Sequence, residues 1–246
     1  AGYWNGSVFI PVDFSFHREN KDNKGKKYGL SKKQRKQQKK TKRDSKLPVA
    51  KRFKELNLKK TDMVVAMFKR VNKRKIEVDY ILLDTWFTTM SLINKLSRIN
   101  NEVHVIGMYK YNSKLSIEGK ARSIKQLRKH TGKMSRARSL KLYYFEYVGQ
   151  IDGTTVKVFI SKRGLGGAWH TIITTNTKLS FKKAMEIYST RWTIEVFFKE
   201  AKQLLGLGKC QSTNFDVQVA QTTITMLRYL LISLRHRMEA YQTIGG

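Results

Sequence analysis

Residues 78–86 contain an apolar run, Tyr-Ile-Leu-Leu, that does not alternate with polar residues and that ends at Asp84. Unalternating runs of this length are typical of interior strands in a sheet covered on both faces. We therefore expect a buried strand here, then a helix over residues 88–99 and another core strand at residues 104–108. This order predicts an α/β architecture in which helices pack against a sheet.

A second apolar run, residues 6–13, reads Gly-Ser-Val-Phe-Ile-Pro-Val-Asp and ends at Asp13. It also predicts a buried strand closed by an aspartate. Aspartates at the carboxyl ends of strands lie where open α/β sheets bind their ligands. The alternative is an ordinary aspartate that leads the chain into a turn.

The chain carries a formal net charge of +32. Such a charge destabilises a compact fold unless a polyanion neutralises it, so nucleic acid is the expected partner. An anionic membrane is the competitor, but no apolar run reaches spanning length and no signal peptide opens the chain. The single cysteine, Cys210, allows no disulfide framework within one chain and fits a reducing cytoplasm.

The basic residues concentrate in residues 18–46. We expect a loop that lies along a DNA backbone and supplies affinity without sequence choice; the alternative is a tract that only solubilises the protein. Residues 46–75 then follow helical spacing, with a break near Asn57. The candidate backbone contacts are Lys32, Lys33, Arg35, Lys36, Lys39 and Lys40.

Residues 111–176 change in character and predict a β-rich insertion. Strands are expected at residues 140–148 and 154–161, joined by a hairpin turn at Asp152-Gly153. A glycine-rich loop, Arg-Gly-Leu-Gly-Gly, follows and leads into another strand at residues 169–175. Trp169 opens that strand, either as a core residue or as a platform for an unstacked base.

Residues 187–203 are expected to be part of a helix that begins after Ser180, its N-cap, and runs to about Leu205. Gly206 and Gly208 end it. At about 100° per residue, four polar positions of this segment fall within roughly 60° of one another. An apolar stripe lies beside them, which places the carboxylate at the edge of a cleft. The alternative is a surface ion pair at spacing i,i+4. The four positions are Tyr188, Arg191, Glu195 and Lys202.

Asp13, Asp84 and Glu195 thus form a set of three carboxylates from two strand ends and a helix. A parallel or mixed sheet can bring them to one edge. Three hard oxygen ligands suit Mg²⁺ or Mn²⁺, and two such ions about 4 Å apart support phosphoryl transfer.

With these residues in place, the sequence resembles the IS-four type of insertion-sequence transposases. The resemblance is carried by the Tyr-x2-Arg-x3-Glu-x6-Lys spacing (the YREK motif), by Tyr-Ile-Leu-Leu-Asp around Asp84 and by Val-Phe-Ile-Pro-Val-Asp before Asp13, and it extends over about residues 8–240. These are DDE transposases with a ribonuclease H-like core. The resemblance implies a mixed sheet flanked by helices, with a β-rich insertion between the second aspartate and the glutamate.

The resemblance also implies roles for single residues. Asp13, Asp84 and Glu195 are the catalytic and metal-binding residues, holding two Mg²⁺ (or Mn²⁺ as substitute) that activate water to nick a transposon end and then the 3′-OH to attack target DNA. Tyr188, Arg191 and Lys202 contact DNA phosphate near the cut. In some relatives a tryptophan in the insertion holds a flipped base, and Trp169 lies in a comparable strand.

The expected organisation is a first part of the core at residues 1–110, the insertion at 111–176 (its last strand rejoining the core) and a second part of the core at 177–246. The family's N-terminal DNA-binding domain is expected to be missing, as in a fragment. Expected partners are double-stranded DNA and a second copy of the chain, in a nucleoid-associated, prokaryotic, cytoplasmic setting. A ribonuclease H-like nuclease without strand transfer and an inactive, domesticated DNA-binding protein remain the alternatives.

Overall fold

The computed structural model describes residues 1–17, 32–110, 113–117, 119–130, 134–164 and 166–238. The chain divides into two compact units. One comprises Ala1–Met67 and Trp192–Gly246, and the other comprises Phe68–Arg191. The first division falls within helix α3 (Lys60–Lys73), and the second falls directly after Arg191.

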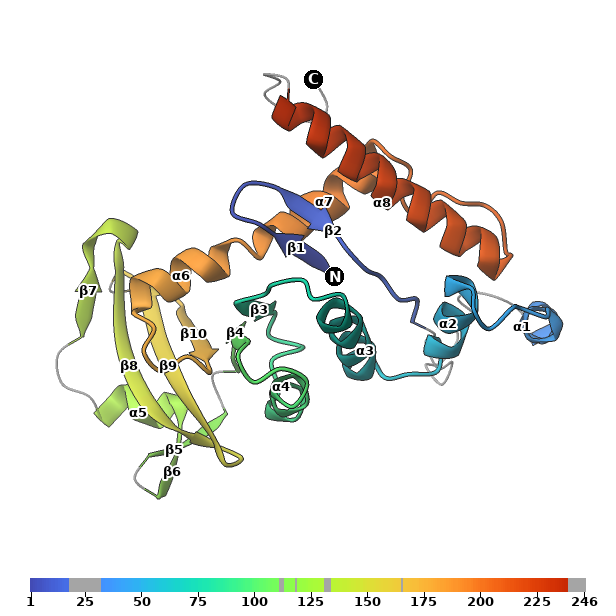
Figure 1. The fold of residues 1–246 in the computed structure, drawn as a ribbon. Helices are drawn as coiled ribbons and strands as arrows, with labels where there is room; N and C mark the ends of the chain where they lie inside the picture. Colours follow the sequence, from blue (N-terminus) through green and yellow to red (C-terminus); the bar gives the residue numbers. More distant parts are fainter. Residues whose placement is uncertain (18–31, 111–112, 118, 131–133, 165, 239–246) are drawn as a thin grey trace. The chain divides into compact units, whose positions relative to one another are not determined.

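The unit Phe68–Arg191 is built on an eight-stranded sheet in the order β3-β4-β10-β9-β8-β5-β6, with β7 paired to β8 beside this path (Figure 1). β3 and β4 are parallel and the other pairings are antiparallel, so the sheet is mixed. Its strands are β3 (Tyr80–Leu83), β4 (His104–Met108), β5 (Lys114–Ile117), β6 (Lys120–Ser123), β7 (Ser135–Ala137), β8 (Leu142–Ile151), β9 (Thr154–Arg163) and β10 (Trp169–Thr174).

Helices cover both faces of this sheet near β4. On one face, Ile106 and Phe159 pack against Phe181 of α6 (Phe181–Ser189). On the other face, Gly107 lies so close to Thr88, just before α4 (Met90–Ser97), that a Cβ at Gly107 would collide with the Thr88 side chain. The remaining helices of this unit are α5 (Ile124–His130) and the 3₁₀ turn η1 (Arg138–Leu140). The predicted α/β fold, a mixed sheet flanked by helices, is confirmed.

Among the described residues of this unit, β3 is at the end of the strand order and pairs with β4 alone. Leu83 is buried, but Tyr80, Ile81 and Leu82 are only partly so. An apolar run indicates that the two faces of a strand are packed; it carries no information on whether both edges are paired.

The central hairpin forms where the sequence predicts it. β8 and β9 pair over ten residues each, from Leu142 opposite Arg163 to Ile151 opposite Thr154. The two turn residues, Asp152 and Gly153, have φ values of 48° and 76°. Positive φ at both central positions matches the twist of the flanking strands, which explains why an Asp-Gly pair closes this hairpin.

The unit Ala1–Met67 with Trp192–Gly246 contains a separate two-stranded antiparallel sheet of β1 (Gly2–Trp4) and β2 (Phe9–Pro11). The Asn5 side chain accepts hydrogen bonds from the backbone N–H groups of Ser7 and Val8, at 3.0 and 2.8 Å, and so closes the turn between them. Within this unit, β2 therefore has β1 as its paired neighbour. The short reversal at residues 5–8 supplies β2 with a local partner.

The core of this unit forms where β2 meets α7 (Trp192–Gln203) and α8 (Phe215–Met238). Phe9, Phe197, Ala201 and Tyr229 are all buried there. The Phe9 and Phe197 ring centroids lie 5.5 Å apart, and Tyr229 contacts both rings edge-on. β2, which leads to Asp13, and α7, which carries Glu195, are thus packed into one core.

The basic tract is partly helical, which corrects the expectation of a loop. Residues 18–31 lie outside the described residues, but α1 spans Lys32–Lys40 and is followed by α2 (Pro48–Glu55). Lysine, arginine and glutamine are good helix formers, and residues 32–40 contain neither glycine nor proline. The break between α2 and α3 occurs near Asn57, as the sequence predicts.

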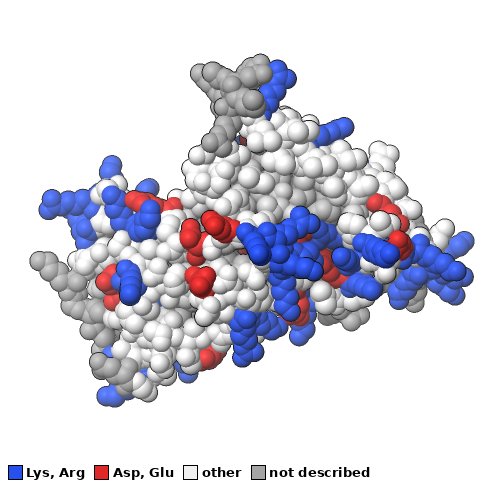
Figure 2. Space-filling view, viewed as in Figure 1, with Lys and Arg blue, Asp and Glu red and all other residues white. Residues whose placement is uncertain are grey.

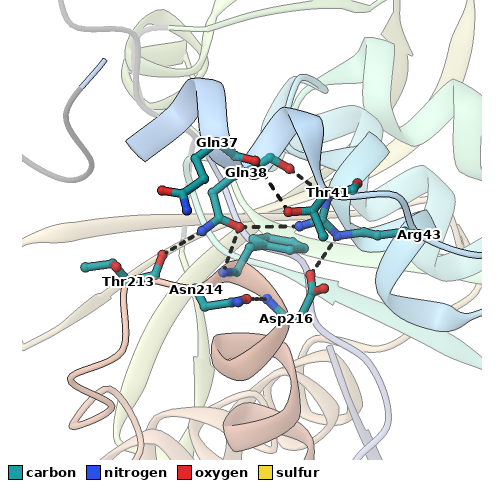
Figure 3. Close-up of polar contacts among 8 residues, drawn as sticks. Gln37, Gln38, Thr41, Arg43, Thr213, Asn214 and Asp216 are labelled. Atoms are coloured by element: carbon teal, nitrogen blue, oxygen red, sulfur yellow. Dashed lines mark hydrogen bonds and ion pairs between the residues drawn. The ribbon is translucent and has the colours of Figure 1, made fainter. Parts of the chain in front are cut away.

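The Gln38 and Arg43 side chains hold α1 against the start of α8 (Figure 3). Gln38 donates to the carbonyl of Thr213 and accepts from the N–H of Phe215, both at 3.2 Å. Arg43 lies 2.7 Å from the Asp216 carboxylate and stacks over the Phe53 ring at 4.2 Å. The basic helix is therefore anchored by neutral and paired side chains, while the side chains of Lys33, Lys36, Lys39 and Lys40 are exposed. The side chains of Lys32 and Arg35 lie outside the described ones.

Candidate active site

Asp84 follows β3 directly and is fixed by a tight turn. Its Oδ1 accepts a hydrogen bond from the Phe87 N–H at 2.9 Å. Its backbone carbonyl accepts from the N–H of Thr88 at 2.9 Å and from the Thr88 hydroxyl at 2.6 Å. The carboxylate is half-buried, and its several lone pairs leave this arrangement compatible with metal coordination.

Asp13 is buried and paired with an arginine in its own unit. Its Oδ1 accepts a hydrogen bond from the N–H of Phe14 at 2.8 Å and is bound by the Arg52 guanidinium. Arg52 also reaches Glu55 at 3.4 Å and lies over the Phe14 ring at 4.6 Å. The hydroxyl of Ser15 donates to Glu55 at 2.6 Å. One guanidinium thus contacts two buried carboxylates, and these bonds fix the chain on both sides of Asp13.

Tyr188 contacts the strand that leads to Asp84. Its hydroxyl donates to the backbone carbonyl of Leu83 at 3.2 Å, and its ring lies in the core between the sheet and α6. Burial raises the pKa of the Tyr188 hydroxyl, although the neighbouring Arg191 opposes the shift. The hydroxyl is therefore a protonated donor at neutral pH. Its predicted contact with DNA phosphate stays a prediction, since in this structure the hydroxyl has a protein acceptor.

The helix expected from Ser180 to about Leu205 is interrupted, which corrects the polar stripe drawn on it. Ser180 caps α6 as predicted, by accepting from the Lys183 N–H. α6 ends at Ser189, and α7 begins at Trp192. The hydroxyls of Ser189 and Thr190 donate back to the carbonyls of Glu186 and Ile187, each at 2.7 Å. Such bonds compete with the backbone ladder and favour termination of the helix.

The four motif residues consequently belong to different units. Tyr188 and Arg191 lie with Asp84, and the Arg191 guanidinium carbon is 5.8 Å from the Tyr188 ring centroid. Glu195 and Lys202 lie with Asp13, on the helix whose buried residues are Phe197 and Ala201. Glu195 is half-buried, whereas Lys202 is exposed. The apolar residues beside Glu195 fix the helix and leave its carboxylate at the boundary of the core.

Trp169 opens β10 and is half-buried under a set of cations. Its ring is stacked on Phe145, with centroids 6.0 Å apart and planes 13° apart. The Nζ of Lys162 and the guanidinium of Arg128 lie 4.9 and 5.0 Å from its centroid. Cations over the face of an indole are favourable contacts. The role of Trp169 as a platform for a flipped base stays a prediction.

Residues 4–231 match the protein family described as Transposase DDE domain. The match covers most of the chain, including both strand-end aspartates and Glu195. The chain belongs to the DDE transposase family. No curated protein sequence matches it significantly.

Family membership assigns the chain a transposase function, and transposases act on DNA. The surplus of basic side chains fits this substrate, and Figure 2 shows that lysines and arginines outnumber acidic residues on the face it draws. Within the described residues, no helix is both long and apolar enough to cross a bilayer.

The donor set of this transposase domain suits a hard divalent cation, because all three predicted ligands are carboxylates. Among the described residues, no group of three His, Cys, Asp or Glu side chains is gathered as a metal site. Asp13 and Glu195 belong to one unit and Asp84 to the other.

Arg52 is the residue of this site that the sequence did not reveal. Its spacing to Glu55 on α2 resembles any surface pair at i,i+3, and it lies 39 positions from Asp13. The acceptor of Tyr188 was also missed, because the bond ends on a backbone carbonyl and side-chain patterns do not report such acceptors.

Proposed function

We propose that this chain is the catalytic domain of an insertion-sequence transposase of the IS-four type, which cuts DNA at transposon ends and joins the 3′-OH to target DNA. The observation that carries the proposal is the family match over residues 4–231, which contains Asp13, Asp84 and Glu195 in the expected order. The positive charge of the chain and the fixed turn at Asp84 support it.

Asp13, Asp84 and Glu195 would hold two Mg²⁺ ions, with Mn²⁺ as substitute. When bound, the metal supplies activation of the attacking oxygen and stabilisation of the leaving oxygen. Arg191 and Lys202 bind phosphate oxygens of the DNA strand. Arginine is suited to this role by its planar fork of donors, which can bond two oxygens of one phosphate.

Tyr188, through Leu83, fixes the strand end from which Asp84 projects. Arg52 binds the carboxylates of Asp13 and Glu55 and keeps the segment after β2 in place. Synapsis of two transposon ends requires at least two copies of the chain on DNA.

The test is nicking of supercoiled plasmid and of the two ends of the parent element, taken from the DNA that flanks its gene. Asp84→Asn and Glu195→Gln should abolish metal-dependent cutting, because each removes a ligand charge with little change of shape. Glu186→Gln, an exposed carboxylate on α6, is the matched control and should cut normally. Undiminished cutting by Asp84→Asn or Glu195→Gln would refute the assignment.

Two further measurements separate the proposal from its alternatives. A hydrolase without joining activity would cut but would not transfer a pre-cut 3′-OH end into plasmid. An inactive DNA-binding protein would bind DNA but show no carboxylate-dependent Mn²⁺ binding by calorimetry. A transposase gives both strand transfer and metal binding that Asp84→Asn weakens.

A further inference from the structure

The glycine-rich loop and the 3₁₀ turn η1 form an open pocket of about 580 Å³ at one end of the large sheet. Its charged lining is entirely basic. It is lined by Arg136 of β7, Arg138 of η1, Lys141, Tyr143 of β8, Arg163 of β9 and Gly164. In Figure 2, a group of Lys and Arg side chains lies over the end of the sheet that Figure 1 labels β7. The motif residues Tyr188, Arg191, Glu195 and Lys202 do not line this pocket.

Strand pairing places these cations together. Arg136 is directly opposite Tyr143, and Leu142 is opposite Arg163, so three strands deliver side chains to one place. The guanidinium of Arg136 lies 5.5 Å from the Tyr143 ring centroid. Side chains directly opposite each other on paired strands are within contact distance, which explains the contact of Arg136 with Tyr143. Arg163 is the last residue of β9 and lies one position along, next to Gly164.

Two unusual backbone segments shape the pocket. Lys141 has a φ of 54° and ends η1, with its N–H bonded to the Arg138 carbonyl at 3.1 Å. Gly164, which lines the pocket, has a φ of 63°. A Cβ at Gly167 would lie 2.0 Å from the Arg163 carbonyl oxygen, so the loop can return beside Arg163 only with glycine there. Glycine at position 167 therefore allows the backbone to pass close to Arg163 beside this pocket.

We propose that this pocket binds the phosphodiester backbone of DNA, as a contact separate from the cutting site. Arg136, Arg138, Lys141 and Arg163 are exposed, so their charges are accessible to a ligand. Four cations around one pocket repel one another, and an anion with several negative charges relieves that repulsion. Arginine forks bond phosphate oxygens in pairs, and the Tyr143 hydroxyl adds a neutral donor. The proposal rests on DNA being the substrate.

The experiment measures binding of a random-sequence DNA duplex, by fluorescence anisotropy without divalent metal, over a range of salt concentrations. Arg138→Gln/Arg163→Gln removes two charges from the pocket. The slope of log K against log salt is negative, and each lost phosphate contact should make it shallower by about 0.9. Loss of two contacts should therefore make it shallower by about 1.8. If the affinities converge at 1 M salt, the variant binds about 60-fold more weakly at 0.1 M.

Lys114→Gln/Lys120→Gln is the matched control. It removes the same charge from β5 and β6, which join β8 at its other end. The control should leave the slope nearly unchanged, and Arg138→Lys/Arg163→Lys should retain most of the parent slope. Circular dichroism and melting temperature should match the parent in all three variants, because the substituted side chains lie on the surface.

Equal slope losses in the pocket variant and the control would overturn the proposal, since the effect would then be one of net charge alone. An unchanged slope in the pocket variant would overturn it as well. Stronger competition by an RNA duplex than by the DNA duplex would assign the pocket to RNA and contradict it. Because no cutting is measured, failure of the transposase proposal in the plasmid assay remains distinguishable from failure of this one.

Discussion

Replacing Tyr188 with phenylalanine tests whether its hydroxyl serves the protein or the DNA. The substitution keeps the ring, which packs among Ile106, Phe159 and Phe181. It removes the hydroxyl, with its bond to the Leu83 carbonyl and its contacts with the Met108 backbone and the Arg191 side chain. Leu83 is 5% exposed and Tyr188 is 9% exposed, so water does not readily replace the lost donor. Leaving a buried acceptor unpaired costs about 1–3 kcal/mol.

The expected loss lies at the lower end of that range, about 1 kcal/mol. The bond measures 3.2 Å, which is long for a hydroxyl donor, and no cavity is created. For a chain of this size such a loss lowers the melting temperature by about 2–4 °C. The effect should also reach Asp84, because Leu83 is the residue before it. We therefore expect faster hydrogen exchange at the Phe87 amide, whose N–H is bonded to the Asp84 carboxylate, and slower metal-dependent cutting.

Tyr147→Phe is the matched control, since the Tyr147 hydroxyl also donates to a backbone carbonyl, that of Leu127, at 3.1 Å in the same unit. It should lower the melting temperature to a similar extent but leave the Phe87 amide and the cutting rate unchanged. A Tyr188→Phe variant that kept the parent melting temperature and Phe87 exchange while losing DNA affinity would refute this structural role of the hydroxyl. The hydroxyl would then act on the DNA phosphate, as the sequence resemblance implies.

Three further variants test the packing of the other unit. Arg52→Met removes the guanidinium that contacts two buried carboxylates and should lower the free energy of unfolding by about 3 kcal/mol. Lys51→Met, on the exposed side of the same helix, should change it little. Equal effects of the two variants in denaturant titrations would contradict the network. Phe197→Ala should cost about 3–5 kcal/mol by leaving a cavity between Phe9 and Tyr229, against a small change for the exposed Phe198→Ala. Burial and the nearby Glu200 raise the pKa of Tyr229, so its stabilising contribution is present below about pH 10 and is lost as pH rises toward the folded-state value. Melting temperatures above pH 10 should therefore fall less steeply in Tyr229→Phe than in the parent.

Local features of the fold could be predicted because short-range chemistry determines them. Asp152 and Gly153 specify a hairpin turn, and Ser180 specifies a helix start, whatever the surrounding fold. The position of β3 at the end of the described strand order and the pairing of β1 with β2 could not be predicted in this way. Both features depend on which strands pair with each other. An apolar run indicates that the faces of a strand are packed, but it does not identify the strand that pairs with it.

The candidate site shows the same distinction. Asp84 and Glu195 were recognisable from an apolar strand end and from a spaced motif. Arg52 was not, because its partner Asp13 is distant in sequence. The helix break after Ser189 could not be predicted, because the helical spacing of apolar residues continues across it. The hydroxyl bonds that end α6 come from one serine and one threonine, which also occur within helices.

The break makes the motif spacing itself testable. Tyr188 and Arg191 are fixed to the unit of Asp84, and Glu195 is fixed to the unit of Asp13 through the packing of α7. Inserting one alanine after Arg191 adds a residue at the boundary of the two units and leaves Tyr188 and Arg191 in place, so each unit should keep its core and the melting temperature should change little. If the carboxylates act on one metal site, cutting should fall by at least a hundredfold, because a displacement of about 1 Å at a reacting centre already has an effect of this size. An alanine inserted between Gly245 and Gly246 is the control. Normal cutting by the variant with alanine after Arg191 would show that Glu195 does not act together with Asp84.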